Sequence, residues 1–298
     1  MNNKGMLYAI AAYGMWGLFP LYWKTIQHVP ALEILSHRMA WSLLFVLGLL
    51  VVRRRWAWLR TAVHTPRTIL LFIASALLLS LNWFVYIWGV NAGHIVETSL
   101  GYFINPLVSV LMGVFFLGES LRRGQWVAIG LAALGVIYLT VRFGALPWIS
   151  LTLATSFALY GLIRKTAPLG SLEGLSLETA LMFFPAFGYL VYLEWTGTAA
   201  FGHVDLLTTV LLAFAGVATA VPLLLFAAGA RRIKLATVGI LQYIAPTLQF
   251  LIGVLIYHEP FTMDRLIGFS IIWLALILYS GENIWFTRRQ PRLQAVGD

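Results

Sequence analysis

The chain has 298 residues, of which 60% are hydrophobic, 14% aromatic and only 10% charged, whereas an ordinary soluble domain carries about 25% charged residues. This composition cannot cover a water-soluble surface, so it excludes a soluble domain. The formal net charge of +9 would suggest nucleic-acid binding in a soluble protein, but here the positions of the basic residues indicate orientation in a membrane, and no nucleic-acid partner is expected. The absence of cysteine excludes disulfides and thiolate chemistry.

Apolar stretches separated by charged or turn residues predict ten transmembrane helices, because about 20 predominantly apolar residues cross the hydrocarbon core. In chain order they are expected near residues 5–26, 33–52, 68–92, 97–117, 125–142, 147–165, 175–195, 206–230, 235–257 and 264–286. The connections are too short for an extramembrane domain, and the first run is interpreted as a retained helix rather than a cleaved signal peptide. The expected fold class is therefore an all-α membrane protein.

The basic residues predict the orientation of these helices. Sixteen of the 20 Lys and Arg residues fall on one side of the predicted topology, and four fall on the other: Lys24, Arg38, Arg142 and Arg265. Since positive residues are retained in the cytoplasm, both termini are expected to be cytoplasmic.

An internal repeat is the most informative pattern in the chain. Residues 103–119, FINPLVSVLMGVFFLGE, align without a gap on residues 243–259, YIAPTLQFLIGVLIYHE, so that a proline, a Gly-Val pair and a glutamate coincide. The same register places Gly89 on Gly229. Five helices per copy is an odd number, so the two copies enter the membrane from opposite sides, as in transporters that work by alternating access.

The repeat also defines the expected domain organisation. A first five-helix repeat is predicted over residues 1–145, an inverted second repeat over 146–290, and a cytoplasmic tail over 291–298.

Two five-helix copies, each with a Pro-x(6)-Gly-Val-x(4)-Glu helix, resemble the EamA-type permeases of the drug/metabolite transporter superfamily, and more closely the RarD branch of that family. The resemblance is carried by Trp16-Gly17 with Pro20, VPALEILSHR at 29–38, SLGYFINPL at 99–107 and QYIAPT at 242–247. It covers essentially the whole chain. It implies a multi-pass protein of the bacterial inner membrane that transports small metabolites or drugs, without defining the substrate.

Polar and aromatic residues that share helix faces are candidates for the lining of a central path, because a polar group in lipid needs a protein or water partner. Trp16 and Trp83 are the tryptophans chosen for aromatic contact with a ligand. The full set of substrate-binding candidates is Trp16, His37, Arg38, Asn82, Trp83, Tyr86, Tyr102, Asn105, Tyr160, Gln242 and Tyr243.

Two further pairs have predicted roles. Pro106 and Pro246 each remove a backbone donor, so each is a candidate hinge, with a static packing bend as the alternative. Glu33 and His37 lie one turn apart at the start of the second helix and are candidates for proton coupling. The alternative is that this pair holds the helix end at the membrane interface.

No nucleotide-binding, metalloprotease or serine-hydrolase motif is found in the sequence, so no enzyme, cofactor or metal site is expected. The leading hypothesis is a secondary transporter that moves a small metabolite or drug, such as an amino acid or a related amphipathic compound, by alternating access. The alternative is an intramembrane lipid-handling protein. The expected partners are a small-molecule substrate and the lipid bilayer, and both a monomer and a homodimer remain open.

Overall fold

The computed structural model describes residues 3–53, 66–118, 120–169, 171–230, 232 and 241–294. All regular elements in these ranges are helical: α1 (Asn3–Gly17), α2 (Phe19–Thr25), α3 (Ala31–Arg53), α5 (Pro66–Asn91), α6 (Ile95–Leu117), α7 (Arg123–Phe143), α8 (Trp148–Thr166), α9 (Ser171–Thr196), α10 (Leu206–Ala230), α12 (Ile244–Leu251), the π-helix η1 (Ile252–Ile256) and α13 (Met263–Gln294). The expected all-α architecture is therefore confirmed.

Among the described residues, seven helices are long and apolar enough to cross a membrane: α3, α5, α6, α7, α9, α10 and α13. Two shorter apolar helices span Trp148–Arg164 and Ile244–Ile256. A chain with this many apolar helices is a multi-pass membrane protein. The last helix continues to Gln294, through half of the segment expected to be a tail, and residues 295–298 lie outside the described ranges.

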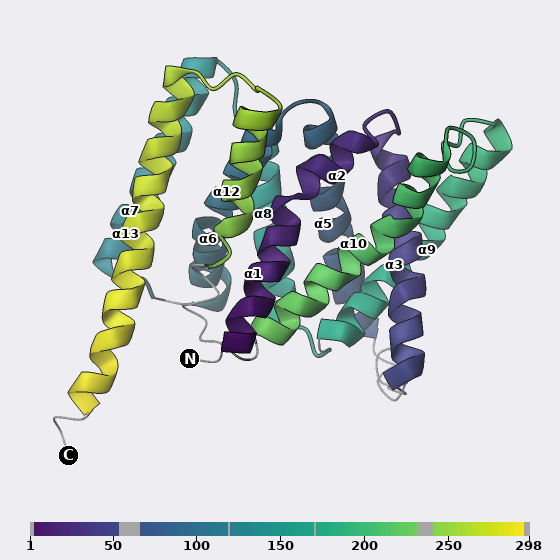
Figure 1. The fold of residues 1–298 in the computed structure, drawn as a ribbon. Coiled ribbons are helices and arrows are strands. Elements are labelled where there is room, and N and C mark those ends of the chain that lie inside the picture. Colours follow the sequence, from purple (N-terminus) through teal and green to yellow (C-terminus); the bar gives the residue numbers. More distant parts are fainter. Residues whose placement is uncertain are drawn as a thin grey trace.

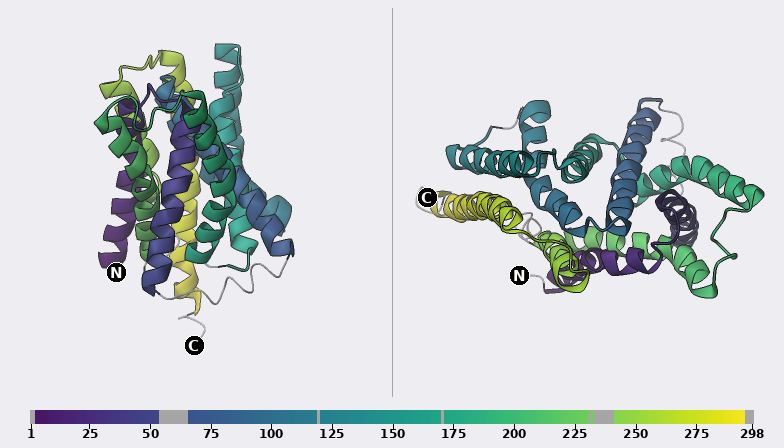
Figure 2. Two further views of the ribbon diagram at one scale, coloured as in Figure 1. Left: turned by 90° about the vertical axis from the view of Figure 1, so that its right-hand side faces the viewer. Right: turned by 90° about the horizontal axis from the view of Figure 1, so that it is seen from above.

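The helices form one bundle in which the start of α1 and the end of α13 lie at the same end (Figure 1). At one flank α7 packs along α13, and at the other flank α3 packs between α9 and α10 (Figures 1 and 2). In the middle, α8 contacts both α5 and α6, while α1 contacts both α10 and α12. Each part of the bundle therefore combines helices from both halves of the sequence.

The first expected helix is divided into α1 and α2. The division falls at Leu18, and Pro20 lies in the first turn of α2, where a residue without a backbone N–H is tolerated. The short helix then places Phe19 and Trp23 in the buried core, where α2 contacts α5.

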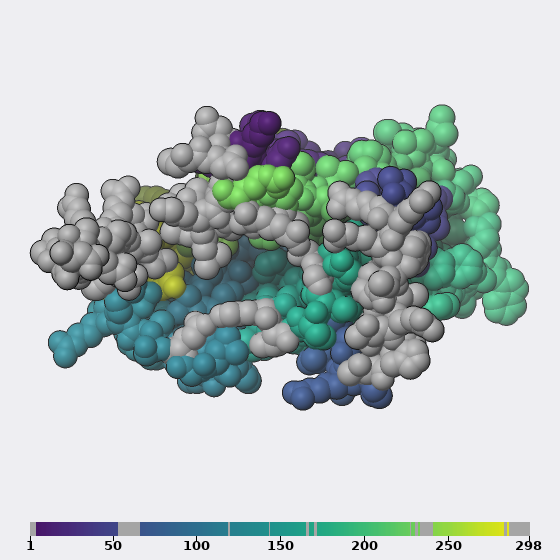
Figure 3. Space-filling view, turned by 90° about the horizontal axis from the view of Figure 1, so that it is seen from below, coloured from purple at the N-terminus to yellow at the C-terminus, as the bar shows by residue number. Residues whose placement is uncertain are grey.

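Glycines allow the closest helix crossings. A Cβ atom on Gly216 of α10 would lie 2.4 Å from the backbone carbonyl carbon of Trp41 in α3, and one on Gly101 of α6 would lie 2.8 Å from the backbone oxygen of Ser150 in α8. At the end where α1 begins, α10 also approaches α1 closely at Gly229 (Figure 3). Small residues at such crossings bring helix backbones together in membrane bundles.

Acidic side chains hold helix starts at the opposite end of the bundle. The two carboxylate oxygens of Glu259 accept the backbone N–H groups of Ile95 and Val96 at 2.7 and 2.8 Å, at the start of α6. Asp205 precedes α10 and accepts the backbone N–H of Thr208 at 2.6 Å, and this hydrogen bond lowers the pKa of the Asp205 carboxyl. These contacts satisfy N–H groups that a helix leaves without intrahelical partners.

Candidate functional site

Arg38 extends from α3 into the core of the bundle, where it is only 2% exposed. Its Nε donates a hydrogen bond of 2.6 Å to Oγ1 of Thr219 in α10. The guanidinium carbon lies 3.8 Å from the ring centre of Trp83 in α5, and 5.4 and 5.7 Å from the rings of Trp23 and Phe19 in α2. This is cation–π geometry. Nη1 of Arg38 is buried and has no hydrogen-bond partner among the described residues.

Two tyrosines and an asparagine continue the site from Arg38 towards α8. Tyr86 and Tyr102 lie within electrostatic reach of the guanidinium, and their rings meet edge to face with centroids 5.6 Å apart. The Tyr102 hydroxyl donates to Oδ1 of Asn82 at 3.2 Å. The Asn82 amide in turn donates to a backbone carbonyl and to the hydroxyl of Ser156 in α8, at 2.9 and 3.0 Å. We call Arg38, Asn82, Trp83, Tyr86 and Tyr102 the central cluster.

Two more candidates border the central cluster. Asn105 is almost buried and donates to the backbone oxygen of Ala154 in α8 at 3.0 Å. Tyr160 is joined to Tyr102 through the ring of Phe157, with centroid separations of 6.4 and 5.7 Å. Seven of the eleven substrate-binding candidates therefore gather where α3, α5, α6 and α8 face one another.

Three further candidates, Trp16, Gln242 and Tyr243, have additional neighbours outside the central cluster. Trp16 packs against Tyr13 and Phe226, with ring centroids 5.5 and 5.8 Å apart. Tyr243 stacks on Phe103 at 6.4 Å, and its neighbour Gln242 is half-buried. Trp16 also packs against the core that contains Trp83 and Tyr86, and a binding role for Trp16, Gln242 and Tyr243 remains a prediction.

The two candidate hinge prolines occupy different local structures, although both are buried. Pro106 lies inside the continuous helix α6. Pro246 lies in the first turn of α12, directly after a turn at residues 242 and 243. A hinge role remains a prediction for both residues.

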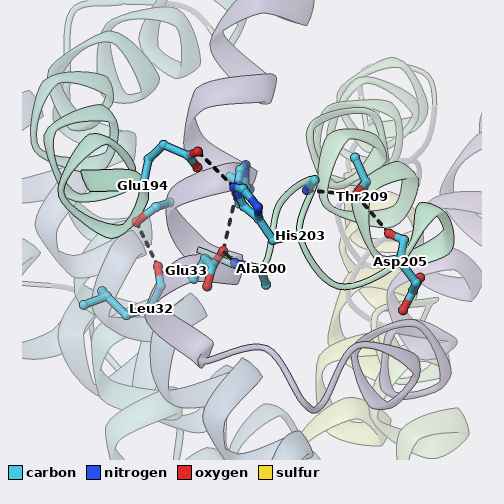
Figure 4. Close-up of polar contacts among 10 residues, drawn as sticks. Leu32, Glu33, Glu194, Ala200, His203, Asp205 and Thr209 are labelled. Carbon is cyan, nitrogen blue, oxygen red and sulfur yellow. Dashed lines mark hydrogen bonds and ion pairs between the residues drawn. The ribbon is translucent and has the colours of Figure 1, made fainter. Parts of the chain in front are cut away.

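Glu33 and His37 lie 4.0 Å apart at the start of α3, and Glu33 lies close to the loop between α9 and α10 (Figure 4). Glu33 is fully buried and accepts the backbone N–H of Ala200 in that loop at 2.7 Å. The His37 ring stacks on Phe201 at 4.8 Å. These contacts fasten the loop to α3, which fits the alternative role of holding a helix end, and proton coupling remains a prediction.

Glu178 of α9 is not among the site residues predicted from the sequence, and its side chain is only 2% exposed. It accepts a hydrogen bond from the hydroxyl of Ser75 and lies 3.8 Å from Nη1 of Arg164, a buried ion pair between α8 and α9. An acidic residue within an apolar stretch was the available signal, because such residues are costly in membranes and need a partner. Among the described residues, no group of three His, Asp or Glu side chains could hold a metal ion.

The fold and the site together define a class: a multi-pass helical membrane protein whose buried polar and charged side chains lie between the helices, as they do along transport pathways. The comparisons with known proteins identify the family. Residues 3–141 match the EamA-like transporter family.

Protein RarD from Streptomyces exfoliatus is 48% identical over 295 residues, which cover 99% of this chain and 94% of the relative. The uncharacterized transporter YojE from Bacillus subtilis (strain 168) is 48% identical over 294 residues, 96% and 97% of the two chains. A solved crystal structure with 14% identity covers 94% of this chain and 98% of its own at a TM-score of 0.59, which shows a shared fold alone. The chain belongs to the EamA-like transporter family as a RarD-like permease, and it is a membrane transporter.

Proposed function

We propose that the chain is a secondary transporter that moves a small metabolite or drug across the bacterial inner membrane by alternating access. In this proposal ten segments cross the membrane: the seven long apolar helices, the shorter α8 and α12–η1 segments, and α1 with α2. They form two five-helix repeats of opposite orientation, with both termini in the cytoplasm.

The positions of the helices support the inverted repeat. The helix starts at Ala31 and Ser171, at Pro66 and Leu206, and at Arg123 and Met263 are each 140 residues apart. The same offset relates Gly118 to His258, and both residues have a left-handed backbone, with φ of 66° and 51°. A non-glycine residue rarely adopts positive φ, so the shared conformation supports an equivalent end for the two proline helices.

The contacts between helices carry the proposal, because they are paired under the same offset. A Cβ atom added to Gly89 of α5 would lie 3.6 Å from Cγ2 of Ile149 in α8. A Cβ atom added to Gly229 of α10 would lie 2.9 Å from the backbone nitrogen of Ala9 in α1. Ala9 is equivalent to Ile149, as Gly89 is to Gly229. Helices α3 and α9, α6 and α12, and α7 and α13 each pack on their own counterpart, as helices beside a two-fold axis in the membrane plane do.

This symmetry gives alternating access a physical basis. Two halves with the same internal packing can exchange conformations, so that a site between them opens to one side of the membrane and then to the other. In this proposal the central cluster is the site between the two halves, which the hydrogen bond from Arg38 of the first repeat to Thr219 of the second supports.

Spin-label distance measurements test the proposal, and the cysteine-free chain allows labels to be placed one pair at a time. Ala92 and Met263 form a pair at one end of the bundle, and the equivalent pair at the other end is Arg232 and Arg123; all four residues are exposed. In nanodiscs, each pair is expected to show two distance populations. Amino acids, their sulfur and aromatic derivatives and chloramphenicol are added one at a time, and a compound that binds is expected to change the relative sizes of the two populations.

Alternating access requires the shifts at the two ends to have opposite signs: when the first pair moves apart, the second pair moves together. A pair within one helix serves as the control, because its distance stays constant. A single unchanged distance for both pairs under all conditions, or changes of the same sign at both ends, would contradict the proposal.

A further inference from the structure

Arg38 is a buried positive charge without a carboxylate partner in the described part of the chain. It lies seven residues into α3, about 10 Å from the helix start at the usual rise per residue. The ion pairs formed within the described ranges involve other residues, and its Nη1 has no hydrogen-bond partner among the same residues. A buried unpaired charge costs several kcal/mol, so an arginine here needs a reason other than stability.

The equivalent position in the second repeat provides a contrast. Glu178 lies 140 residues after Arg38 and is just as deeply buried, but the protein supplies its counterparts in the Ser75 hydroxyl and the Arg164 guanidinium. One repeat thus carries a buried anion matched by a cation. The other carries a buried cation whose matching anion is not among the described side chains.

The unsatisfied polar groups around Arg38 can all donate a hydrogen bond. The indole N–H of Trp23, the hydroxyl of Tyr86 and Nη1 of the arginine itself are buried and have no hydrogen-bond partner in the part of the chain that the structure describes. The nearest oxygen, Oγ1 of Thr219, already accepts from Arg38 and donates to the backbone oxygen of Ala215 at 2.8 Å. A carboxylate, which accepts up to about four hydrogen bonds and pairs closely with guanidinium, is the complementary group.

We propose that Arg38 binds the carboxylate of the transported substrate, with Tyr86 and Trp23 as further donors. The rings of Trp83 and Tyr102 then receive the apolar or aromatic body of the molecule. The substrate class is therefore small organic carboxylates with an apolar or aromatic side group. That the bound molecule is transported rests on the proposed function, whereas its binding at Arg38 can be measured without transport.

The test compares matched probes on the purified full-length chain in nanodiscs, by thermal shift and isothermal calorimetry. Phenylacetate and indoleacetate carry the carboxylate; phenylacetamide and phenethylamine keep an aromatic ring but replace the anion. The carboxylates are expected to raise the melting temperature and bind, while the amide and the amine do neither. In R38Q the affinity for the carboxylates falls by about tenfold or more, the range that loss of a charged hydrogen bond gives.

Two further variants separate binding from folding. R38K keeps the charge but loses the planar fork, so its affinity lies between those of wild type and R38Q. R142Q is the control, because Arg142 is exposed and paired with Asp264; carboxylate binding is unchanged in this variant. Without ligand, R38Q melts no lower than wild type, since the variant removes an uncompensated buried charge.

Each contrary result overturns the inference. Equal stabilisation by the amide or the amine would reject carboxylate recognition, and equal stabilisation by inorganic phosphate or chloride would reject an organic substrate. Carboxylate binding that survives R38Q would place the site elsewhere. A large loss of stability in ligand-free R38Q would assign Arg38 to cation–π packing instead. A failure of the spin-label experiment with intact binding would reject alternating access alone.

Discussion

At the scale of single residues, Glu259 shows how one carboxylate joins distant parts of the chain. It follows the π-helix and receives the first two N–H groups of α6, where the helix dipole also favours a negative charge. We expect Glu259→Ala to lower the free energy of unfolding by about 2 kcal/mol, since it removes two charge-assisted hydrogen bonds at a helix start. The melting temperature of the purified protein measures this loss.

Glu194→Ala is the matched control. Glu194 also makes a hydrogen bond, to His203, but its side chain is 60% exposed, and exposed pairs contribute at most about 1 kcal/mol. If both variants melt at the wild-type temperature, Glu259 does not stabilise the start of α6.

At the scale of helices, close approach at glycine determines how α3 and α10 pack. Gly216→Ala places a methyl group 2.4 Å from a backbone atom of Trp41, and the backbones must move apart. We expect this variant to lose about 1–3 kcal/mol, the usual cost of overpacking. Thermal unfolding in detergent checks the prediction.

Gly188→Ala provides the opposite expectation in the same experiment. Gly188 lies inside α9 with no atom within 4 Å of the added Cβ, so the variant gains helix propensity worth up to about 1 kcal/mol. A stabilised Gly216→Ala would mean that the α3–α10 crossing has room for a side chain.

At the scale of the whole molecule, the orientation in the membrane can be tested because the natural chain contains no cysteine. His203→Cys places a thiol in the exposed loop between α9 and α10, and Arg123→Cys places one at the exposed start of α7. The proposed topology puts the first position outside and the second in the cytoplasm. In intact cells, a membrane-impermeant maleimide is expected to label the variant at 203 but not the one at 123.

Permeabilised cells are the control, because both thiols then react. Labelling of position 123 alone in intact cells would reverse the orientation. Labelling of both would contradict the odd number of crossings, made by α7, α8 and α9, that the proposed topology places between the two positions.

Local sequence patterns were sufficient to predict the class of protein and the approximate bounds of several of its helices, whereas the start of the helix expected near residues 235–257 lies outside the described residues. Apolar runs of membrane-crossing length and the turn residues between them are properties of short segments, and the helices that begin at Ala31, Pro66, Ile95 and Arg123 start within two residues of the expected positions. The residues of the central cluster were also named in advance, because polar and charged side chains stand out in apolar helices. The inverted repeat remains a prediction that the helix offsets and paired contacts support.

Which of these residues meet could not be predicted from local patterns. Arg38 bonds to a residue 181 positions away and Glu259 to one 164 positions away, and such contacts depend on how complete helices pack. For this reason the sequence does not indicate the buried pair of Glu178 and Arg164, and binding roles for Trp16, Gln242 and Tyr243 remain predictions. The tertiary structure alone decides that Arg38 has no carboxylate partner among the described residues, because the charge on one helix is balanced only by side chains that neighbouring helices bring close in space.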